Sequence, residues 1–165
     1  MSNLDFYGPR TAHGSSLSRA IGASLLARAG RPDDALTELR TALRLDLDDL
    51  TGTTAGGLHL SAMGGCWQTI LVGFAGVRVR DGVLAIDPVL PGSWSQLGLR
   101  FHCLGRRLRL DIRHHEVQIE TDRPLRVRVG ADVPVTISGT ATVQLREPGH
   151  EGADDNETGT DRSAG

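Results

Sequence analysis

The sequence predicts an α+β fold in which a helical part is followed by an antiparallel β-sandwich. Apolar residues recur with helical spacing over residues 15–74, and they alternate with polar residues over 76–146. Apart from Pro148, the last segment, 147–165, has no apolar side chain larger than alanine, and its six acidic residues against one arginine give a net charge of −5. We therefore expect helices over 1–75, the sandwich over 76–146 and a disordered acidic tail over 147–165.

Composition narrows the possible functions. The 165 residues are 39% hydrophobic and 23% charged, with a formal net charge of −2, which argues against a globally basic nucleic-acid-binding protein. No apolar run is long enough to cross a bilayer or forms a secretory signal, so we expect a cytoplasmic protein without membrane or nucleic-acid partners. All 18 basic residues are arginine, so no lysine is present to act as a base. The two cysteines, Cys66 and Cys103, are expected to be reduced thiols.

Three helices are expected in the first half. The first begins after Gly14, with Ser15 or Ser16 as its N-cap, and ends at Gly30 as the C′ residue. The second begins at Pro32, and the short link makes the two helices antiparallel. The expected buried faces are, for the first, Leu17, Ala20, Ile21, Ser24 and Leu25, and for the second, Ala35, Leu36, Leu39, Ala42 and Leu43.

The third helix is expected over roughly 55–72. Its predicted apolar stripe consists of Met63, Cys66, Trp67, Ile70 and Phe74. Two adjacent glycines, Gly64 and Gly65, are costly inside a helix, and they predict that another backbone passes close by.

Short alternating segments predict the sheet. Asp81-Gly82 is typical of a type I′ hairpin between 77–80 and 83–86. Further strands are expected at Leu99–Leu104, Leu108–Arg113, Val117–Glu120, Leu125–Val129, Val133–Ile137 and Thr142–Arg146. Arginines that alternate with apolar residues predict a solvated face, with a polyanion or partner site as the alternative: Arg107, Arg109, Arg113, Arg126 and Arg128.

Two helix starts are candidate anion sites. Because the first and third helices run in the same direction, their N-termini lie at the same end of the helical layer. Ser15 and Ser16 stand at one start, and Gly57 stands at the other with His59 one turn further on. Free N–H groups, glycine and histidine suit a phosphate, although ordinary caps and a surface histidine explain the same residues.

Other catalytic patterns are weaker. Asp46, Asp48 and Asp49 form either a loop of capping aspartates or, as the alternative, the paired carboxylates of a glycosidase. His114 and His115 point to opposite faces of a strand, so we expect no metal site there. We also expect no cofactor.

Several motifs resemble glycoside hydrolase family 65, which includes maltose, trehalose and kojibiose phosphorylases and related hydrolases. Thr11-Ala12-His13-Gly14-Ser15-Ser16-Leu17-Ser18 resembles the family's serine motif. Thr53-Thr54-Ala55-Gly56-Gly57-Leu58-His59 resembles its Gly-x-His helix start. Gly73–Gly82, followed by Asp87-Pro88-Val89-Leu90-Pro91 and Trp94, resembles the passage into its C-terminal β-domain. The resemblance covers about residues 5–130.

The resemblance implies a fold and a role. The fold would be the terminal helices of an (α/α)6 barrel followed by the C-terminal antiparallel β-sandwich. Ser15, Ser16, Gly57 and His59 would bind phosphate, a possible co-substrate, beside an α-linked glucose disaccharide. The family chemistry is inverting, and the general-acid Glu corresponds to a position upstream of the matched residues, so this chain would hold no catalytic residue.

Three functional hypotheses follow. The chain is a C-terminal fragment of such an enzyme that is inactive alone, or one half of a split enzyme whose partner chain supplies the rest of the barrel. The third hypothesis is a non-catalytic carbohydrate-binding or interaction module that uses the sandwich. A split enzyme would expose an apolar edge on its helices.

Overall fold

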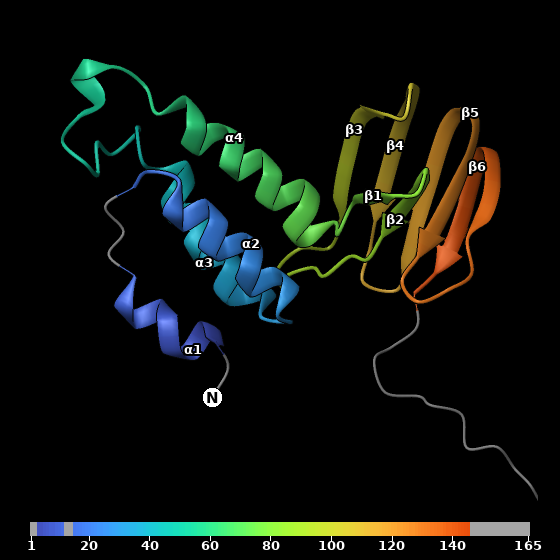
Figure 1. Ribbon diagram of the computed structural model, residues 1–165, viewed down its shortest axis with the longest axis horizontal. Coiled ribbons are helices and arrows are strands. Elements are labelled where there is room, and N and C mark those ends of the chain that lie inside the picture. Colours follow the sequence, from blue (N-terminus) through green and yellow to red (C-terminus); the bar gives the residue numbers. More distant parts are fainter. Residues whose placement is uncertain (1–2, 12–14, 146–165) are drawn as a thin grey trace, which may run out of the picture.

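The computed structural model describes residues 3–11 and 15–145 and confirms the α+β class. A layer of helices lies beside a curled six-stranded sheet (Figure 1). The helical elements are α1 (Asn3–Tyr7), a 3-10 turn (Gly8–Arg10), α2 (Ser18–Arg28), α3 (Pro32–Leu43), a second 3-10 turn (Thr54–Gly56), α4 (Leu60–Gln68) and a π-helical segment (Thr69–Phe74). The strands are β1 (Arg78–Arg80), β2 (Val83–Ile86), β3 (Leu97–Cys103), β4 (Arg106–Ile112), β5 (Glu116–Val129) and β6 (Val135–Gln144). The expected tail, 147–165, lies outside the described residues.

The turn between α2 and α3 follows the prediction. Gly30, two residues after the end of α2, has a φ of +76°, and the Arg31 N–H donates to the Leu26 carbonyl at 3.0 Å, which closes the helix in the usual manner of a C-terminal glycine. Pro32 then opens α3 at its first position. Four residues of the predicted α3 stripe are buried, while Leu43 is exposed: Ala35, Leu36, Leu39 and Ala42.

The buried face of α2 agrees with the prediction at Ala20 but not at the larger apolar residues. Its buried residues are all alanines: Ala20, Ala23 and Ala27. The larger Ile21 and Leu25, which the spacing placed in the core, are exposed. Small side chains let α2 lie close to α3 and to the π-helical segment, so this face was selected by close packing rather than by hydrophobicity.

The helix expected over 55–72 consists of separate pieces. Gly57, with a φ of +132°, ends the second 3-10 turn, and α4 starts three residues later. After α4 the chain widens into the π-helical segment, where the Thr69 hydroxyl donates to the carbonyls of Ala20 at 2.7 Å and Gly65 at 2.9 Å. This buried hydroxyl therefore ties α4 to α2.

The predicted stripe of this region is partly wrong. Cys66 and Phe74 are buried and Ile70 is half-buried, whereas Met63 and Trp67 are exposed. The cause is again close packing on α2, because a Cβ at Gly65 would lie 2.6 Å from Leu17 Cδ1 and 2.9 Å from Ala20 Cβ. The close approach is therefore at Gly65 and not at Gly64, and it is to side chains rather than to the predicted backbone.

The first hairpin has the expected turn, and the later strands are longer than expected. Asp81 and Gly82 have φ values of +51° and +73°, as a type I′ turn requires. The four strands expected after residue 116 form two longer strands. β5 continues across an irregularity between Thr121 and Leu125, and β6 passes through Gly139 at a φ of +75°. A bulge and a glycine bend these strands without ending them.

The sheet order is β1-β2-β5-β4-β3, with β6 also paired to β5. The first part of β5 pairs with β4, and its last residues pair with β2. The β2–β5 pairing is parallel, with Leu84 opposite Val127, so the expectation of antiparallel pairing throughout is wrong at this place. Since β5 reaches β2 only after the β3–β4 hairpin, the intervening chain is long enough for a parallel crossover.

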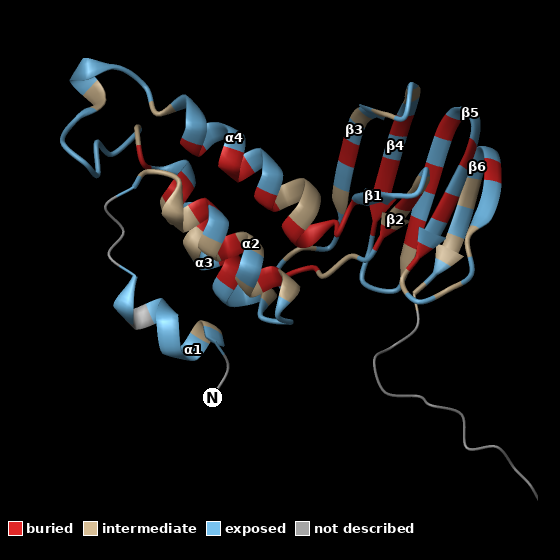
Figure 2. Ribbon diagram, in the orientation of Figure 1, coloured by how far each residue is buried: buried red, intermediate tan, exposed pale blue. Residues whose placement is uncertain are grey.

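Two hydrophobic clusters make up the core. One lies on the sheet and the other lies among α2, α3 and α4, as the buried bands in Figure 2 show. Ile70, Trp94 and Leu97 pack against both clusters. The five arginines expected on a wet face are all exposed, which agrees with a solvated surface.

A tight junction joins the helical layer to the sheet. Gly76 has a φ of +64°, and a Cβ there would lie 2.0 Å from the Asp87 carbonyl oxygen. The Arg28 guanidinium at the end of α2 forms an ion pair with the Asp87 carboxylate. Phe74 and Trp94 pack at this junction, with ring centroids 4.9 Å apart.

Candidate functional site

The predicted site residues belong to the starts of α2 and α4. Both helices begin at the same end of the helical layer, on the left in Figure 1, as their directions predict. Nevertheless, the described contacts place the serines and His59 in different surroundings. Each group is therefore considered separately.

His59 is held by a carboxylate from the loop after α3. It occupies the N-cap position of α4, and its backbone N–H donates to Asp46 Oδ2 at 2.9 Å. Its ring Nδ1 lies 2.5 Å from Asp46 Oδ1. The two side chains are largely covered, with 21% of His59 and 11% of Asp46 exposed. The loop and the helix start are thus joined by two hydrogen bonds to one carboxylate.

The hydrogen bonds from His59 lower the pKa of Asp46, chiefly through the ring and next through the backbone N–H. Asp46 is therefore a carboxylate near neutral pH, and it cannot serve as a proton donor to a sugar. Two of the three loop aspartates, Asp46 and Asp49, cap backbone N–H groups as predicted, whereas Asp48 forms an ion pair, so the three have different partners and do not form a glycosidase pair. Asp49 Oδ1 accepts the Thr54 N–H at 2.9 Å, and Asp48 pairs with Arg44 at 2.5 Å.

The other ring nitrogen of His59 faces two threonines. His59 Nε2 lies 3.1 Å from Thr53 Oγ1, which is 2.6 Å from Thr51 Oγ1. Both threonines are exposed, so this side of the imidazole meets solvent through a hydroxyl. The hydrogen-bonded chain Asp46–His59–Thr53–Thr51 is hereafter called the histidine relay.

Gly57 lies beside the histidine relay but does not offer a free amide. Its N–H donates to the Thr54 carbonyl at 3.0 Å within the 3-10 turn. Its φ of +132° is a conformation that side chains rarely adopt, so glycine is needed for the chain to enter α4. Asp46 occupies the N–H of His59, so the chain's own carboxylate takes part of the anion-binding capacity that the sequence predicted for an external ligand.

Neither serine is the N-cap of α2. That position is Leu17, and the helix has no side-chain cap. Ser15 Oγ accepts the Leu17 N–H at a long 3.4 Å, and the Ser15 carbonyl accepts the Ser18 hydroxyl at 2.8 Å. Ser16 is half-buried. The prediction of an N-cap is wrong because the chain makes one further turn before the helix begins.

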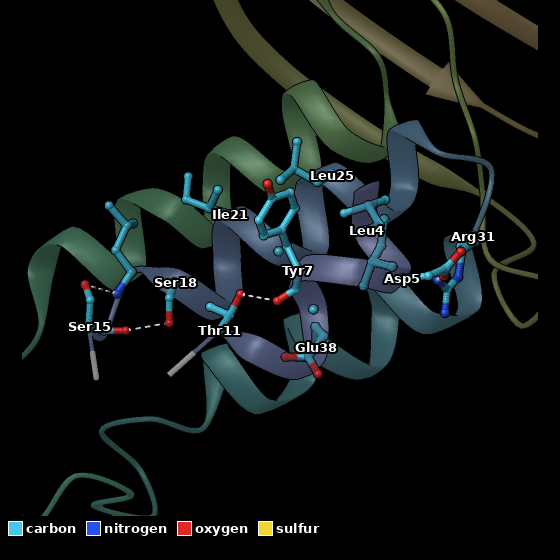
Figure 3. A pocket seen from close by; sticks show the side chains of 14 residues that line it. Leu4, Asp5, Tyr7, Thr11, Ser15, Ser18, Ile21, Leu25, Arg31 and Glu38 are labelled. Atoms are coloured by element: carbon cyan, nitrogen blue, oxygen red, sulfur yellow. Dashed lines mark hydrogen bonds and ion pairs between the residues drawn. The ribbon is translucent and has the colours of Figure 1, made fainter. Parts of the chain in front are cut away.

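Ser15 lines an open hollow of about 680 Å³ between α1 and α2. Figure 3 shows the ring of Tyr7 among the apolar side chains of this hollow, close to Leu25, with Ser15 at one end. Arg31 at the far end forms an ion pair with Asp5 at 3.1 Å. The hollow is mainly apolar and contains neither His59 nor Gly57.

Sequence reasoning missed the partnership of Asp46 and His59. The two are 13 residues apart, and only the path of the loop after α3 brings them together. Capping rules concern the residue at the helix start itself, so they give no signal for a carboxylate 13 residues upstream. His114 Nε2 lies 2.8 Å from the Trp94 carbonyl oxygen.

No described helix has the length and apolar character needed to span a membrane. Cys66 and Cys103 are both free, and burial raises the pKa of each thiol. They are therefore protonated and unreactive near neutral pH, as expected for structural cysteines.

Comparisons with known proteins match almost the whole described chain. Residues 1–68 match the model of the glycosyl hydrolase family 65 central catalytic domain, and residues 77–145 match that of the family's C-terminal domain. The chain is 37% identical over 117 residues to a kojibiose phosphorylase of Halothermothrix orenii and 36% identical over 107 residues to an alpha,alpha-trehalose phosphorylase of Geobacillus stearothermophilus. It is 34% identical over 139 residues to a maltose phosphorylase of Bacillus subtilis.

These alignments cover 71%, 65% and 83% of the chain, but only 15%, 14% and 18% of the respective relatives. The chain thus spans less than a fifth of the length of the relatives it matches. A solved structure from the human microbiome, assigned as a kojibiose phosphorylase, superposes with a TM-score of 0.79 at 25% identity. That superposition covers 88% of this chain and 22% of the other.

Proposed function

Because the chain belongs to glycosyl hydrolase family 65, of which it carries a C-terminal portion, we propose that it supplies one wall of the phosphate subsite of an inverting enzyme. The substrate would be an α-linked glucose disaccharide, as the names of the relatives suggest. The observation that carries the proposal is the histidine relay, which fixes an imidazole at the start of α4.

The relay assigns a role to each group. His59 Nε2–H, when the ring is protonated, donates to a phosphate oxygen, and the Thr53 hydroxyl can donate beside it. We further propose that Ser15 and Ser16 add hydroxyls from the start of α2, which lies at the same end of the layer although the described contacts of Ser15 do not include His59. Gly57 leaves the approach free of a side chain. In the hydrolases of the family, a water molecule would take the place of phosphate.

We also propose that this chain supplies no general acid and does not turn over a disaccharide by itself. A glycosidase acid needs a raised pKa. Arg113 instead lowers the pKa of Glu116, and Glu38 pairs with Arg19 at 3.1 Å. Glu120 is exposed on the sheet. None of these three lies in the histidine relay.

Two measurements on the full chain test the proposal. In the presence of inorganic phosphate, neither glucose 1-phosphate nor glucose should form from trehalose, maltose or kojibiose, and turnover would contradict the missing acid. Inorganic phosphate at ten times its dissociation constant should stabilise the chain by about 1.4 kcal/mol, or roughly 3–6 °C in melting temperature. His59→Ala should abolish this shift, whereas His102→Ala, an exposed histidine on β3, should retain it. A shift that survives His59→Ala would place the anion elsewhere.

Exposed apolar side chains favour a second candidate, one half of a split enzyme. Ile21 and Leu25 of α2 are 41% and 52% exposed, and Met63 and Trp67 of α4 are each 45% exposed. Such pairs, one helical turn apart, favour a surface that packs against further helices. Co-expression with the neighbouring reading frame should yield a co-purifying, active pair, and a frame that encodes no catalytic domain would rule this candidate out.

The sheet gives little support to a carbohydrate-binding module. Sugar platforms use exposed aromatic rings, and among the described residues of the six strands the single aromatic, Phe101, is half-buried. Trp94, in the loop before β3, packs on Phe74. The exposed rings, such as Tyr7 and Trp67, belong to the helices.

A further inference from the structure

We propose that Asp46 is a positioning residue that fixes the ring of His59 with its proton on Nδ1 and its Nε2 directed to the ligand. This inference rests on the proposed phosphate subsite for its functional meaning, but not for its geometry. Both oxygens of the Asp46 carboxylate contact His59, one at the backbone N–H (2.9 Å) and one at Nδ1 (2.5 Å). The ring is therefore fixed relative to its own backbone by a single side chain.

The protonation of the ring follows from the chemistry of the carboxylate. An ionised carboxylate only accepts hydrogen bonds, so the close Nδ1 must be the donor. A neutral His59 then has a bare Nε2, which accepts the Thr53 hydroxyl at 3.1 Å. A protonated His59 has a second N–H at Nε2, which is available to an anionic oxygen.

The two neighbouring aspartates of the loop have partners other than His59. Asp48, two residues later, is paired through both carboxylate oxygens with Arg44, at 2.5 and 2.7 Å. Asp49 is turned to the Thr54 N–H by a backbone φ of +46°, and it acts on His59 only through its charge at longer range. Each loop aspartate thus has its own basic or N–H partner, and among the described residues the Asp46 carboxylate is hydrogen-bonded to His59 and not to an arginine.

The consequence for the ligand is electrostatic. The Asp46 carboxylate partly balances the charge of a protonated imidazole and fixes its orientation through Nδ1. A phosphate at Nε2 would therefore contact a cation that is already stabilised and oriented by the loop. Removing the carboxylate frees the ring to rotate and to move its proton to Nε2. The same arrangement tunes histidines behind metal ions, where loss of the supporting partner costs about 10–100-fold in affinity.

The test reads the ring nitrogens directly. The full chain, labelled with ¹⁵N-histidine, is studied by two-dimensional NMR above pH 8, and the His59 signals are assigned with His59→Ala. The parent should show a protonated Nδ1 and a bare Nε2. Asp46→Asn, which can still accept one N–H, should shift the proton to Nε2 in a large part of the molecules. Asp46→Glu, which keeps the carboxylate, should restore the parent pattern at least in part.

Asp49→Asn is the matched control, because it removes a neighbouring carboxylate that also caps a backbone N–H without touching the ring. It should leave the His59 pattern unchanged, even if both variants lower the melting temperature. A parent ring with its proton on Nε2, or an identical pattern in Asp46→Asn, would overturn the proposal. A merely structural cap would lower stability in both variants and leave the tautomer of His59 alone.

Phosphate titration separates this inference from the proposed function. If both hold, inorganic phosphate shifts the His59 signals of the parent, and Asp46→Asn weakens that binding at least about tenfold, while Asp49→Asn changes it less. If phosphate leaves the parent unaffected but the tautomer follows Asp46, the phosphate subsite is refuted and the positioning role stands. If phosphate binds equally well to Asp46→Asn, the functional role of Asp46 is refuted.

Discussion

Gly64 and Gly65 are adjacent in α4 and meet opposite surroundings. A Cβ at Gly65 would overlap the side chains of Leu17 and Ala20, whereas one at Gly64 would meet nothing within 4 Å. We expect Gly65→Ala to destabilise the protein by about 1–2 kcal/mol, since crowding of about 1–3 kcal/mol exceeds the helix-propensity gain. Gly64→Ala has only that gain and should stabilise by up to about 1 kcal/mol.

Urea unfolding of the two variants and the parent measures both effects. The opposite signs are the informative result, because general intolerance of α4 to substitution would destabilise both variants. Equal stability of Gly65→Ala and the parent would mean that α2 and α4 are further apart than the structure shows.

The lowered pKa of Asp46 has a consequence at acid pH. Because its pKa is lower in the folded than in the unfolded chain, the unfolded chain takes up the proton first. The stability from this group is complete above the ordinary aspartate value of about 3.9, and it is lost as the pH falls through the lowered value. Asp46→Asn should therefore flatten the decline of unfolding free energy below about pH 4.

Urea midpoints measured between pH 3 and pH 6 check this prediction. Asp81→Asn is the control, because Asp81 is exposed at the β1–β2 turn and asparagine tolerates its positive φ. A decline in Asp46→Asn as steep as that of the parent would show that His59 does not stabilise the carboxylate.

At the residue scale, the sequence was a good guide to which groups matter and a poor guide to what they touch. His59 was found because histidine after glycine at a helix start is unusual and chemically useful. Its partner Asp46 was considered, but as one of three equivalent carboxylates. Their roles differ only because the loop gives each aspartate a separate partner, and no spacing rule contains that path.

Among the elements, Gly76 has a special position between the π-helical segment and β1. It has a positive φ and lies against the backbone of Asp87. Gly76→Ala should destabilise by about 3 kcal/mol or more, because left-handed strain and a backbone collision act together. Gly82→Ala, with a similar φ of +73° and open space, should cost only about 1–2 kcal/mol.

Thermal and urea unfolding of these two variants separate strain from collision. The difference between them is the contribution of the close approach that joins the two layers. Equal losses would show that the junction has room to adjust.

Turn chemistry was the most predictable property of the elements. The Asp81-Gly82 hairpin, the glycine after α2 and the proline that opens α3 were all confirmed, since each depends on one or two residues. Buried faces were less predictable, because α2 carries an alanine face and a larger apolar face, and periodicity cannot choose between them. Strand ends were missed where a bulge in β5 allowed pairing to continue.

Over the whole molecule, several large apolar side chains of α2 and α4 remain exposed to solvent. We expect the isolated chain to self-associate as its concentration rises, because the side chains of Ile21, Leu25, Met63 and Trp67 remain partly in water. Replacing all four with glutamine should yield a monomer. Sedimentation velocity over a range of concentrations measures the change.

Val133→Gln with Val135→Gln is the matched control, since both valines are exposed apolar residues at the sheet. This double variant should associate as the parent does. A parent that stays monomeric at high concentration would show that the helical surface is stable in water, and it would remove the support for a partner on that side.

The α+β class and the order of helices before strands were predictable because each half of the chain keeps one periodicity. Sheet topology was not, because the parallel pairing of Leu84 with Val127 joins residues separated by a hairpin. The sequence also could not predict that Ser15 and His59 have separate contacts. Two helices that run in the same direction begin at the same end of the layer, but this does not fix the distance between their starts.

The pairing of β2 with β5 also affects how the protein folds during its synthesis on the ribosome. During synthesis β2 leaves the ribosome with its β1 neighbour, and residues 127–129, which cover its other edge, follow only after β3 and β4. Until then the nascent chain presents Leu84 and Ile86 on an unpaired edge, a known route to aggregation. Chaperone dependence should therefore fall abruptly once translation passes β5.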